Sequence, residues 1–392
     1  MMPLSSAVES QSSHVDPPMV TRAGRITVEV SRDLDVRPED AAAIDRLISA
    51  NPHLGVFVSR AWLSGLFEEP PPGVEPLLVL LRDGDELRGF APIGIAAART
   101  HDRIVMLGGG AESDRVDLVA ARGCETACAD ALMTWIAQTF GPRGYVFELR
   151  DVPAESCLWG AVHRVNDGGG GRLAFLPRDV HTLPYLDLAE ARNETLTSLA
   201  KHRRWLERRG RLRIELLRDP SEALTALTAL ADFLYARWSG AGQRSALDSP
   251  ATIRFHRRAI PLLLCDGRLR MIRISSDMRT VAVFYGMAVG HWWGYYLAGY
   301  DREWAGRIHL GQITLATAID MAAREGARQF DFLKGVERVK YLWPVRERSA
   351  IDADAYSAHW GSQFDRALRA GRDLAAATAK SARDVFSTRA SQ

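Results

Sequence analysis

The feature that most constrains the fold is an internal repeat, in which two long segments of the chain show the same order of elements. Residues 77–96 (LLVLLRDGDELRGFAPIGIA) resemble residues 269–289 (LRMIRISSDMRTVAVFYGMAV), and both patterns predict a β-hairpin. Residues 125–149 resemble residues 309–333, and both predict a helix followed by a buried strand. The sequence therefore predicts one α/β unit used twice. Two unrelated α/β domains that share a common element order remain the alternative.

The length of the chain agrees with this organisation. At roughly 150 residues per domain, 392 residues hold two medium domains and some additional chain. We expect a disordered lead over residues 1–22, a first half that is non-catalytic over residues 23–182, and a second half over residues 183–350. A C-terminal helix and tail are expected over residues 351–392, in which Trp360, Phe364 and Leu368 cover the core.

Composition and charge exclude several classes of protein. The 50 Lys and Arg residues balance 48 Asp and Glu residues, so we expect no specific nucleic-acid partner. Apolar runs are too short for a transmembrane segment, and no secretory signal is visible, which predicts a cytoplasmic protein. The four cysteines form no CxxC pair, and His163 and His181 lack metal-ligand spacing, so no metal is expected.

The second copy contains the more compact candidate ligand site. Its long aromatic strand ends at Tyr300, and a helix is expected to open near Gly311 after a loop that holds Gly306 and Arg307. The free amides and partial positive charge of a helix N-terminus suit a pyrophosphate group. The glycine runs at residues 108–110 and 167–172 lack phosphate-loop spacing and are interpreted as flexible connectors.

Two charged features have both a structural and a functional interpretation. Asp331 lies on a mostly apolar strand and aligns with Glu148 in the first copy; it either forms an ion pair with a nearby cation or takes part in chemistry. The candidate cations for that pair are Lys334, Arg338 and Lys340. The basic helix at Lys201–Arg211 (KHRRWLERRGR) either attracts an anionic ligand or forms a solvated helical face.

The segment from residue 331 to residue 343 resembles a known family. Asp331 to Gly335 (DFLKG), followed by Lys340 and Trp343, is similar to the end of GNAT-type acyltransferases related to cellulose-biosynthesis acetyltransferases, the CelD/BcsL-like group. Two positions depart from the pattern, since Val339 stands where the family usually has Tyr, and Leu310 precedes Gly311 where it usually has Pro. The resemblance implies two fused GNAT-like folds, as in FemAB-like transferases, with mixed central sheets flanked by helices.

The resemblance also implies an activity and a set of site residues. It implies acyl transfer from acetyl-CoA or another acyl-CoA to an amine or hydroxyl of a small molecule or glycan precursor, alongside polysaccharide-biosynthesis proteins. Asp331 would act as the base, Lys340 would stabilise charge, and Tyr341 would replace the missing family tyrosine as proton donor. The residues implied to bind the cofactor are Gly299, Tyr300, Gly306, Arg307, Gly311 and Gln312. An aminoacyl-tRNA-dependent FemAB-like transferase and a degenerate scaffold protein remain alternatives.

Overall fold

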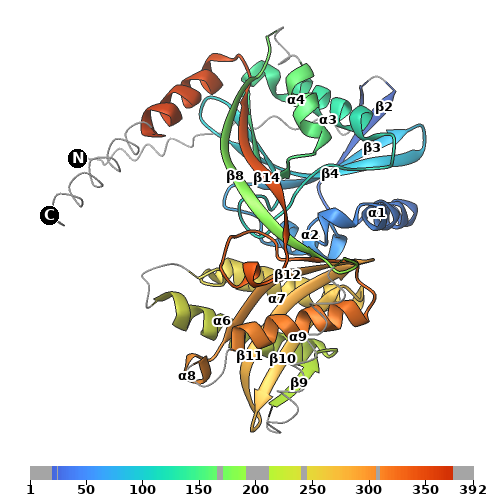
Figure 1. Cartoon of the computed structure of the whole chain (residues 1–392). Helices are drawn as coiled ribbons and strands as arrows, with labels where there is room; N and C mark the ends of the chain where they lie inside the picture. Colours follow the sequence, from blue (N-terminus) through green and yellow to red (C-terminus); the bar gives the residue numbers. More distant parts are fainter. Residues whose placement is uncertain are drawn as a thin grey trace, which may run out of the picture.

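One mixed β-sheet runs through the whole molecule and joins its two halves. The computed structural model describes residues 20–23, 25–165, 171–190, 212–239, 245–305 and 310–373. In this part of the chain, 14 strands form a single sheet in the order β1-β2-β3-β4-β5-β7-β14-β8-β13-β12-β11-β10-β9, with β6 paired to β4. The helices pack on the faces of this sheet, and the two halves lie one above the other in Figure 1.

The first half begins with antiparallel strands and ends with a parallel pair. The hairpin of β3 and β4 turns at Gly84, where φ is +60°, as the Asp83-Gly84 signal predicted. Strand β5 then pairs parallel with β7, and α3 connects them. The elements are β1 (Val20–Ala23), β2 (Ile26–Ser31), α1 (Pro38–Ala50), η1 (Pro52–Leu54), α2 (Arg60–Glu68), β3 (Glu75–Asp83), β4 (Glu86–Ala97), β5 (Asp102–Met106), β6 (Val119–Ala120), α3 (Glu125–Phe140), η2 (Gly141–Arg143), β7 (Tyr145–Pro153), α4 (Cys157–Arg164) and β8 (Ala174–Asp187).

The second half repeats this order. Its hairpin is β10 and β11, and α9 connects β12 to the parallel strand β13. The elements are β9 (Leu212–Leu216), α6 (Pro220–Ser239), α7 (Pro250–Cys265), β10 (Leu269–Ser276), β11 (Arg279–Val289), β12 (Trp292–Tyr300), α8 (Arg302–Ala305), α9 (Leu310–Arg324), β13 (Gln329–Asp331), η3 (Lys340–Leu342) and β14 (Arg346–Tyr356), followed by helical residues 360–373. The expected hairpin, helix and strand of each copy are therefore present.

Each half ends in a strand that pairs with the other half. Strand β8 follows the first half and pairs antiparallel with β13 of the second. Strand β14 follows the second half and pairs antiparallel with β7 of the first. The two exchanged strands also pair with each other from residue 174 to residue 185 of β8, and they lie side by side at the centre of Figure 1. The sheet is continuous because of this exchange.

Three expectations about the ends of the chain need correction. Residues 20–22, expected to be disordered, lie in β1, because β2 offers them a pairing edge. Residues 351–356, expected to be helical, lie in β14, because β7 and β8 pair with both of its edges. The side chains of Trp360, Phe364 and Leu368 are exposed, because the helix that carries them projects from the first half (Figure 1). The basic segment Lys201–Arg211 lies outside the described residues.

A shared hydrophobic core holds the halves together on the face of the sheet that α1, α2, α6 and α7 cover. It includes Trp62 of α2 and Phe255 of α7, whose rings meet edge to face with centroids 4.8 Å apart. Helix α2 approaches α7 closely at Gly65, where an added Cβ atom would lie 2.5 Å from a ring carbon of Phe255. The contact between the halves therefore depends on a residue without a side chain at this position.

Replacing Gly65 by Ala is expected to lower the free energy of unfolding by about 1–3 kcal/mol, the usual cost of overfilling a packed core. The Phe255 ring is buried and is already in edge-to-face contact with Trp62. Gly371→Ala is the matched control, because a Cβ atom there meets nothing within 4 Å. Chemical denaturation measures both variants, and equal stabilities would show that the α2–α7 contact is not tight.

Candidate functional site

The second half contains a strand edge that the rest of the sheet leaves open. Strand β12 pairs with β11 along its whole length but with β13 only over Trp292, Trp293 and Gly294. Strand β13 ends at Asp331, and the chain turns away at Leu333, where φ is +56°. The other edge of β12 over residues 295–300 has no strand partner among the described residues. This split between parallel strands provides a place for an extended ligand to bind.

A pocket of ≈ 400 Å³ lies at the end of β12. Phe233 and Arg237 of α6 and Arg302 of α8 form its walls together with Gly299 and Tyr300. Helix α6 lies very close to the strand here, since a Cβ atom on Gly299 would lie 2.9 Å from a methyl group of Leu230. The residues that line the pocket include two guanidinium groups and no carboxylate, which favours an anionic ligand.

The structure brings together several of the residues implied to bind the cofactor. Helix α9 begins at Leu310, so Gly311 and Gln312 lie in its first turn. A Cβ atom on Gly311 would lie 3.0 Å from the ring of Tyr300, so the end of β12 contacts the start of α9. Gly306 and Arg307 lie outside the described residues. The described start of α9 therefore lies beside the strand end that lines the pocket, and the N-terminal end of a helix favours an anionic group.

Asp331 is buried and held by partners on both halves. Its side chain is 0% exposed, and its Oδ2 atom accepts hydrogen bonds from Arg115 Nη1 at 3.3 Å and Trp292 Nε1 at 3.2 Å. Its Oδ1 atom accepts one from the Leu333 amide, and Arg348 Nη1 lies 4.0 Å away. The ion pair that the sequence suggested is therefore present, but with Arg115 and Arg348 instead of the neighbouring cations. The Asp331 carboxylate is therefore enclosed by its partners and has no exposed oxygen.

Lys340 and Tyr341 both follow β13 but differ in burial. Lys340 is buried, and its Nζ atom donates to the main-chain oxygens of Lys334 and Gly335 at 2.7 and 3.3 Å and pairs with Glu337. Tyr341 is exposed, and its hydroxyl donates to Glu347 at 2.7 Å. Lys340 thus shapes the loop, whereas the Tyr341 hydroxyl is open to solvent.

A carboxylate that the sequence analysis missed lies beside β12 and belongs to the first half. The main-chain oxygen of Glu112 accepts a hydrogen bond from the Tyr296 hydroxyl at 3.0 Å, and its Oε1 atom accepts one from Thr252 Oγ1 at 2.9 Å. Its side chain is 19% exposed. Tyr296 lies in the open stretch of β12, so Glu112 lies beside that stretch.

The chemical environment of Glu112 makes it a candidate base. Burial raises its pKa, although the hydrogen bond from Thr252 acts in the opposite direction. The neighbouring His256, whose Nε2 atom lies 3.7 Å from Glu112 Oε2, is buried, and burial lowers its pKa to about 3. His256 is therefore neutral near pH 7 and does not neutralise the carboxylate. A partly exposed carboxylate with a raised pKa is suited to accept a proton.

The glycines before Glu112 form a tightly packed loop, whereas the sequence suggested a flexible connector. Gly108 and Gly110 adopt positive φ angles of 92° and 75°, and a Cβ atom on Gly109 would lie 2.5 Å from the main-chain oxygen of Arg150. The loop is thus packed tightly against the end of β7. Three consecutive glycines with an acidic residue two positions after them were the available signal for Glu112.

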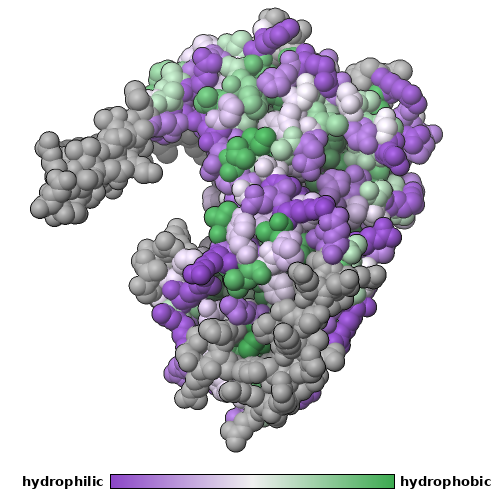
Figure 2. Space-filling model, viewed as in Figure 1, coloured by the Kyte–Doolittle hydropathy of each residue, from purple (hydrophilic) through white to green (hydrophobic). Residues whose placement is uncertain are grey.

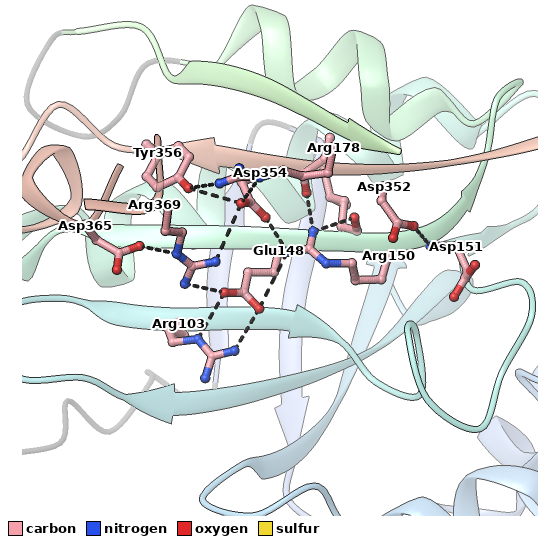
Figure 3. A network of polar contacts seen from close by, with 12 residues as sticks. Arg103, Glu148, Arg150, Asp151, Arg178, Asp352, Asp354, Tyr356, Asp365 and Arg369 are labelled. Atoms are coloured by element: carbon pink, nitrogen blue, oxygen red, sulfur yellow. Dashed lines mark hydrogen bonds and ion pairs between the residues drawn. The ribbon is translucent and has the colours of Figure 1, made fainter. Parts of the chain in front are cut away.

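The region of the first half that corresponds to the open edge of β12 contains a network of ion pairs. Glu148 accepts from Arg103 at 3.1 and 2.8 Å and from Arg369 at 2.8 Å (Figure 3). Burial disfavours its charged form, but these two arginines outweigh that effect and lower its pKa to about 2. The network continues to Asp354 of β14, which binds Arg150 and Arg178. Strand β5 is the counterpart of β12, and it pairs with β4 on one edge and with β7 over Asp102–Val105 on the other, so the described part of the first half has no equivalent of the open edge of β12.

On the face seen in Figure 2, hydrophilic residues cover much of the surface, and hydrophobic residues are dispersed among them. No helix in the described part of the chain combines the length and the hydropathy that crossing a bilayer requires.

Comparison with known proteins supports the predicted fold. Residues 193–341 match the family model described as the acetyltransferase (GNAT) domain. The chain is similar to the crystal structure of FemX, with a TM-score of 0.56, 10% identity, and coverage of 80% of this chain and 95% of that one. The predicted α/β fold of two GNAT-like units is therefore confirmed. The CelD/BcsL-like group is not confirmed, and no curated protein matches the chain.

Two further solved structures are more distantly similar. One is the C-terminal domain (DUF2156) of a putative lysylphosphatidylglycerol synthetase from Agrobacterium fabrum, with a TM-score of 0.49, 12% identity, and coverage of 83% of this chain and 94% of that one. The other is a tandem GNAT protein from the clavulanic acid biosynthesis pathway, with a TM-score of 0.42, 13% identity, and coverage of 84% and 98%.

Proposed function

We propose that the second half transfers an acyl group from a coenzyme A thioester to an amine or hydroxyl. The observation that carries this proposal is the open edge of β12 over residues 295–300, which leads to a pocket lined by Arg237 and Arg302. The match of residues 193–341 to the GNAT acetyltransferase domain supports it. The first half contributes Glu112 but binds no donor of its own.

The donor binds along this edge. Its amide-containing arm pairs with the free main-chain groups of residues 295–300, as an added strand does. Its phosphates lie near Arg237, Arg302 and the first turn of α9, where Gly311 and Gln312 offer amides. Main-chain N–H groups of β12 polarise the thioester carbonyl and stabilise the oxyanion.

The reaction is direct transfer, and Glu112 is the proton acceptor. The acceptor nitrogen or oxygen bonds to the thioester carbon, its proton passes to Glu112, and the carbon–sulfur bond breaks to release the thiolate. We assign this role to Glu112 instead of Asp331, because Glu112 is partly exposed and Asp331 is enclosed by Arg115, Trp292 and Arg348. Asp331 and Lys340 act as positioning residues for the loop after β13.

The proton donor and the acceptor molecule follow from the same proposal. Tyr341 returns a proton to the thiolate, because its hydroxyl is exposed on the loop that follows β13. The acceptor is a small molecule or a glycan precursor, and polysaccharide biosynthesis is the setting that the resemblance of residues 331–343 favours.

Replacing both Arg237 and Arg302 by Ala is expected to weaken binding of acetyl-CoA by about 10²–10⁴-fold, since charged hydrogen bonds contribute about 1.5–3 kcal/mol each and two are lost. Isothermal titration calorimetry with the full chain measures this loss. Arg324→Ala is the control, because its partner Asp320 lies on the exposed side of α9, and it leaves binding unchanged.

The same titration separates the alternative functions. The proposal is supported if the wild-type chain binds acetyl-CoA and the double variant loses this binding. Binding of aminoacyl-tRNA with no response to any CoA species would favour the FemAB-like donor. No binding of either class would favour the scaffold alternative.

A further inference from the structure

Three potential metal ligands meet where the exchanged strands join the first half. Asp151 lies near the end of β7, His181 lies in β8 and Asp352 lies in β14. One ligand atom from each residue lies within 4.8 Å of the other two. No metal-ligand spacing is visible around His181 in the sequence, because the three residues come from separate strands that only the folded sheet brings together.

The distances fit a shared cation. His181 Nε2 lies 3.2 Å from Asp352 Oδ2 and 3.9 Å from Asp151 Oδ1. Ligands about 2.0–2.2 Å from a tetrahedral zinc ion are separated from each other by about 3.4 Å. Small side-chain rotations therefore suffice to bring the three atoms to coordinating distance.

One ring nitrogen of His181 and one oxygen of each aspartate lie close together in the cluster. His181 Nε2 is buried and has no hydrogen-bond partner among the described residues, although two carboxylates lie beside it. The other oxygen of each aspartate is already fixed, since Asp151 Oδ2 accepts from the Gly110 amide and Asp352 Oδ1 accepts from the Asp151 amide. Figure 3 shows Asp151 and Asp352 next to each other at one end of the ion-pair network. Main-chain bonds thus hold both carboxylates in place, with one oxygen of each near His181.

We propose that Asp151, His181 and Asp352 form a binding site for one divalent transition-metal ion, with zinc as the best fit. One imidazole and two carboxylates suit zinc, whereas magnesium prefers oxygen ligands alone. Two carboxylate charges balance the charge of the ion. The site is separate from the proposed acyl-transfer site and does not depend on it.

One competitor for this site is present in the chain. Lys334 Nζ lies 2.7 Å from Asp151 Oδ1, so the ammonium group occupies part of the space that the ion needs. Its side chain is one-third exposed, which leaves it free to move into solvent. The ion and Lys334 therefore exclude each other at Asp151.

Binding of the ion would connect parts of both halves. It links β7 and β8 to β14, and through Asp151 and Gly110 it fixes the loop that carries Glu112. The ion is thus a structural clamp at the strand exchange, not a reactant.

The test uses the full-length, untagged protein after removal of metals with a chelator. Titration with ZnCl₂ is expected to give one ion per chain, with MnCl₂ weaker and MgCl₂ weaker still. His181→Ala and Asp352→Asn each lower zinc affinity by at least about 10-fold, the lower range for changes in a metal site. Lys334→Met raises the affinity, because it removes the competing charge. His163→Ala, which changes an exposed histidine of α4, has no effect.

Crystals soaked in zinc supply an independent measurement, since anomalous diffraction is expected to place one peak between the three side chains. Circular dichroism shows which variants are folded, and the proposal is judged on the folded ones. It is overturned if the wild-type chain binds no zinc, if folded His181 and Asp352 variants bind as tightly as wild type, or if magnesium binds as tightly as zinc.

Discussion

Replacing Glu112 by Gln is expected to lower kcat by about 10²–10⁴-fold, the range attributed to a well-placed general base. The amide keeps the hydrogen bond from Thr252 and nearly the same volume, so binding of the acyl-CoA donor and the free energy of unfolding change little. Steady-state kinetics on the full chain measures the effect. Glu155→Gln is the control, since Glu155 is exposed and belongs to the same half.

The pH profile gives a second readout of the same residue. A base must be deprotonated, so kcat/KM falls as the pH drops through the pKa of Glu112. Burial raises that pKa, which places the acidic limb of the profile above the ordinary glutamate value of 4.5. This acidic limb is expected to be absent from the kcat/KM profile of the Glu112→Gln variant. Full activity in the variant, or an unchanged acidic limb, would remove Glu112 from the mechanism.

Replacing Asp331 by Asn is expected to lower the free energy of unfolding by about 3–5 kcal/mol, the cost of breaking a buried ion pair from one side. The reason is Arg115, which is 1% exposed and would keep its charge without a counter-ion. Chemical denaturation measures the loss. Asp320→Asn is the control, because it breaks only the partly exposed pair with Arg324, and such pairs contribute about 0–1 kcal/mol.

The stability of this variant also separates the two roles proposed for Asp331. If Asp331 is a positioning residue, its replacement lowers the free energy of unfolding, and any fall in turnover accompanies that loss. A variant that is as stable as the wild type but inactive would instead support the base role that the resemblance implied.

The sequence predicted the elements whose pattern is local. Several elements depend only on residues that are close in the chain. They are the hairpin at Asp83-Gly84, helices α3 and α9, and the helix followed by a strand in both copies. Hydrophobic periodicity and turn residues determine such elements, so they can be inferred without knowledge of the rest of the fold.

The features that the sequence did not predict depend on residues far apart. Strand β8 contains two prolines and no clear alternation, and its β conformation is stabilised by pairing with β14. The sequence indicates that Asp331 is an acidic residue on an apolar strand, but its partner Arg115 lies 216 residues away, and local spacing favours the nearer cations. Glu112 was missed because its importance comes from Tyr296 and Thr252 of the other half.

The strand exchange has a consequence for how the protein is made. While the ribosome is still synthesising the second half, the outer edge of β7 has no partner, because the strand that pairs with it, β14, follows the second half in the chain. The amino-terminal half therefore cannot complete its sheet as an independent unit during translation. Its final pairing waits for residues 346–356 to leave the ribosome, and premature termination before them leaves both halves with unprotected strand edges that favour aggregation.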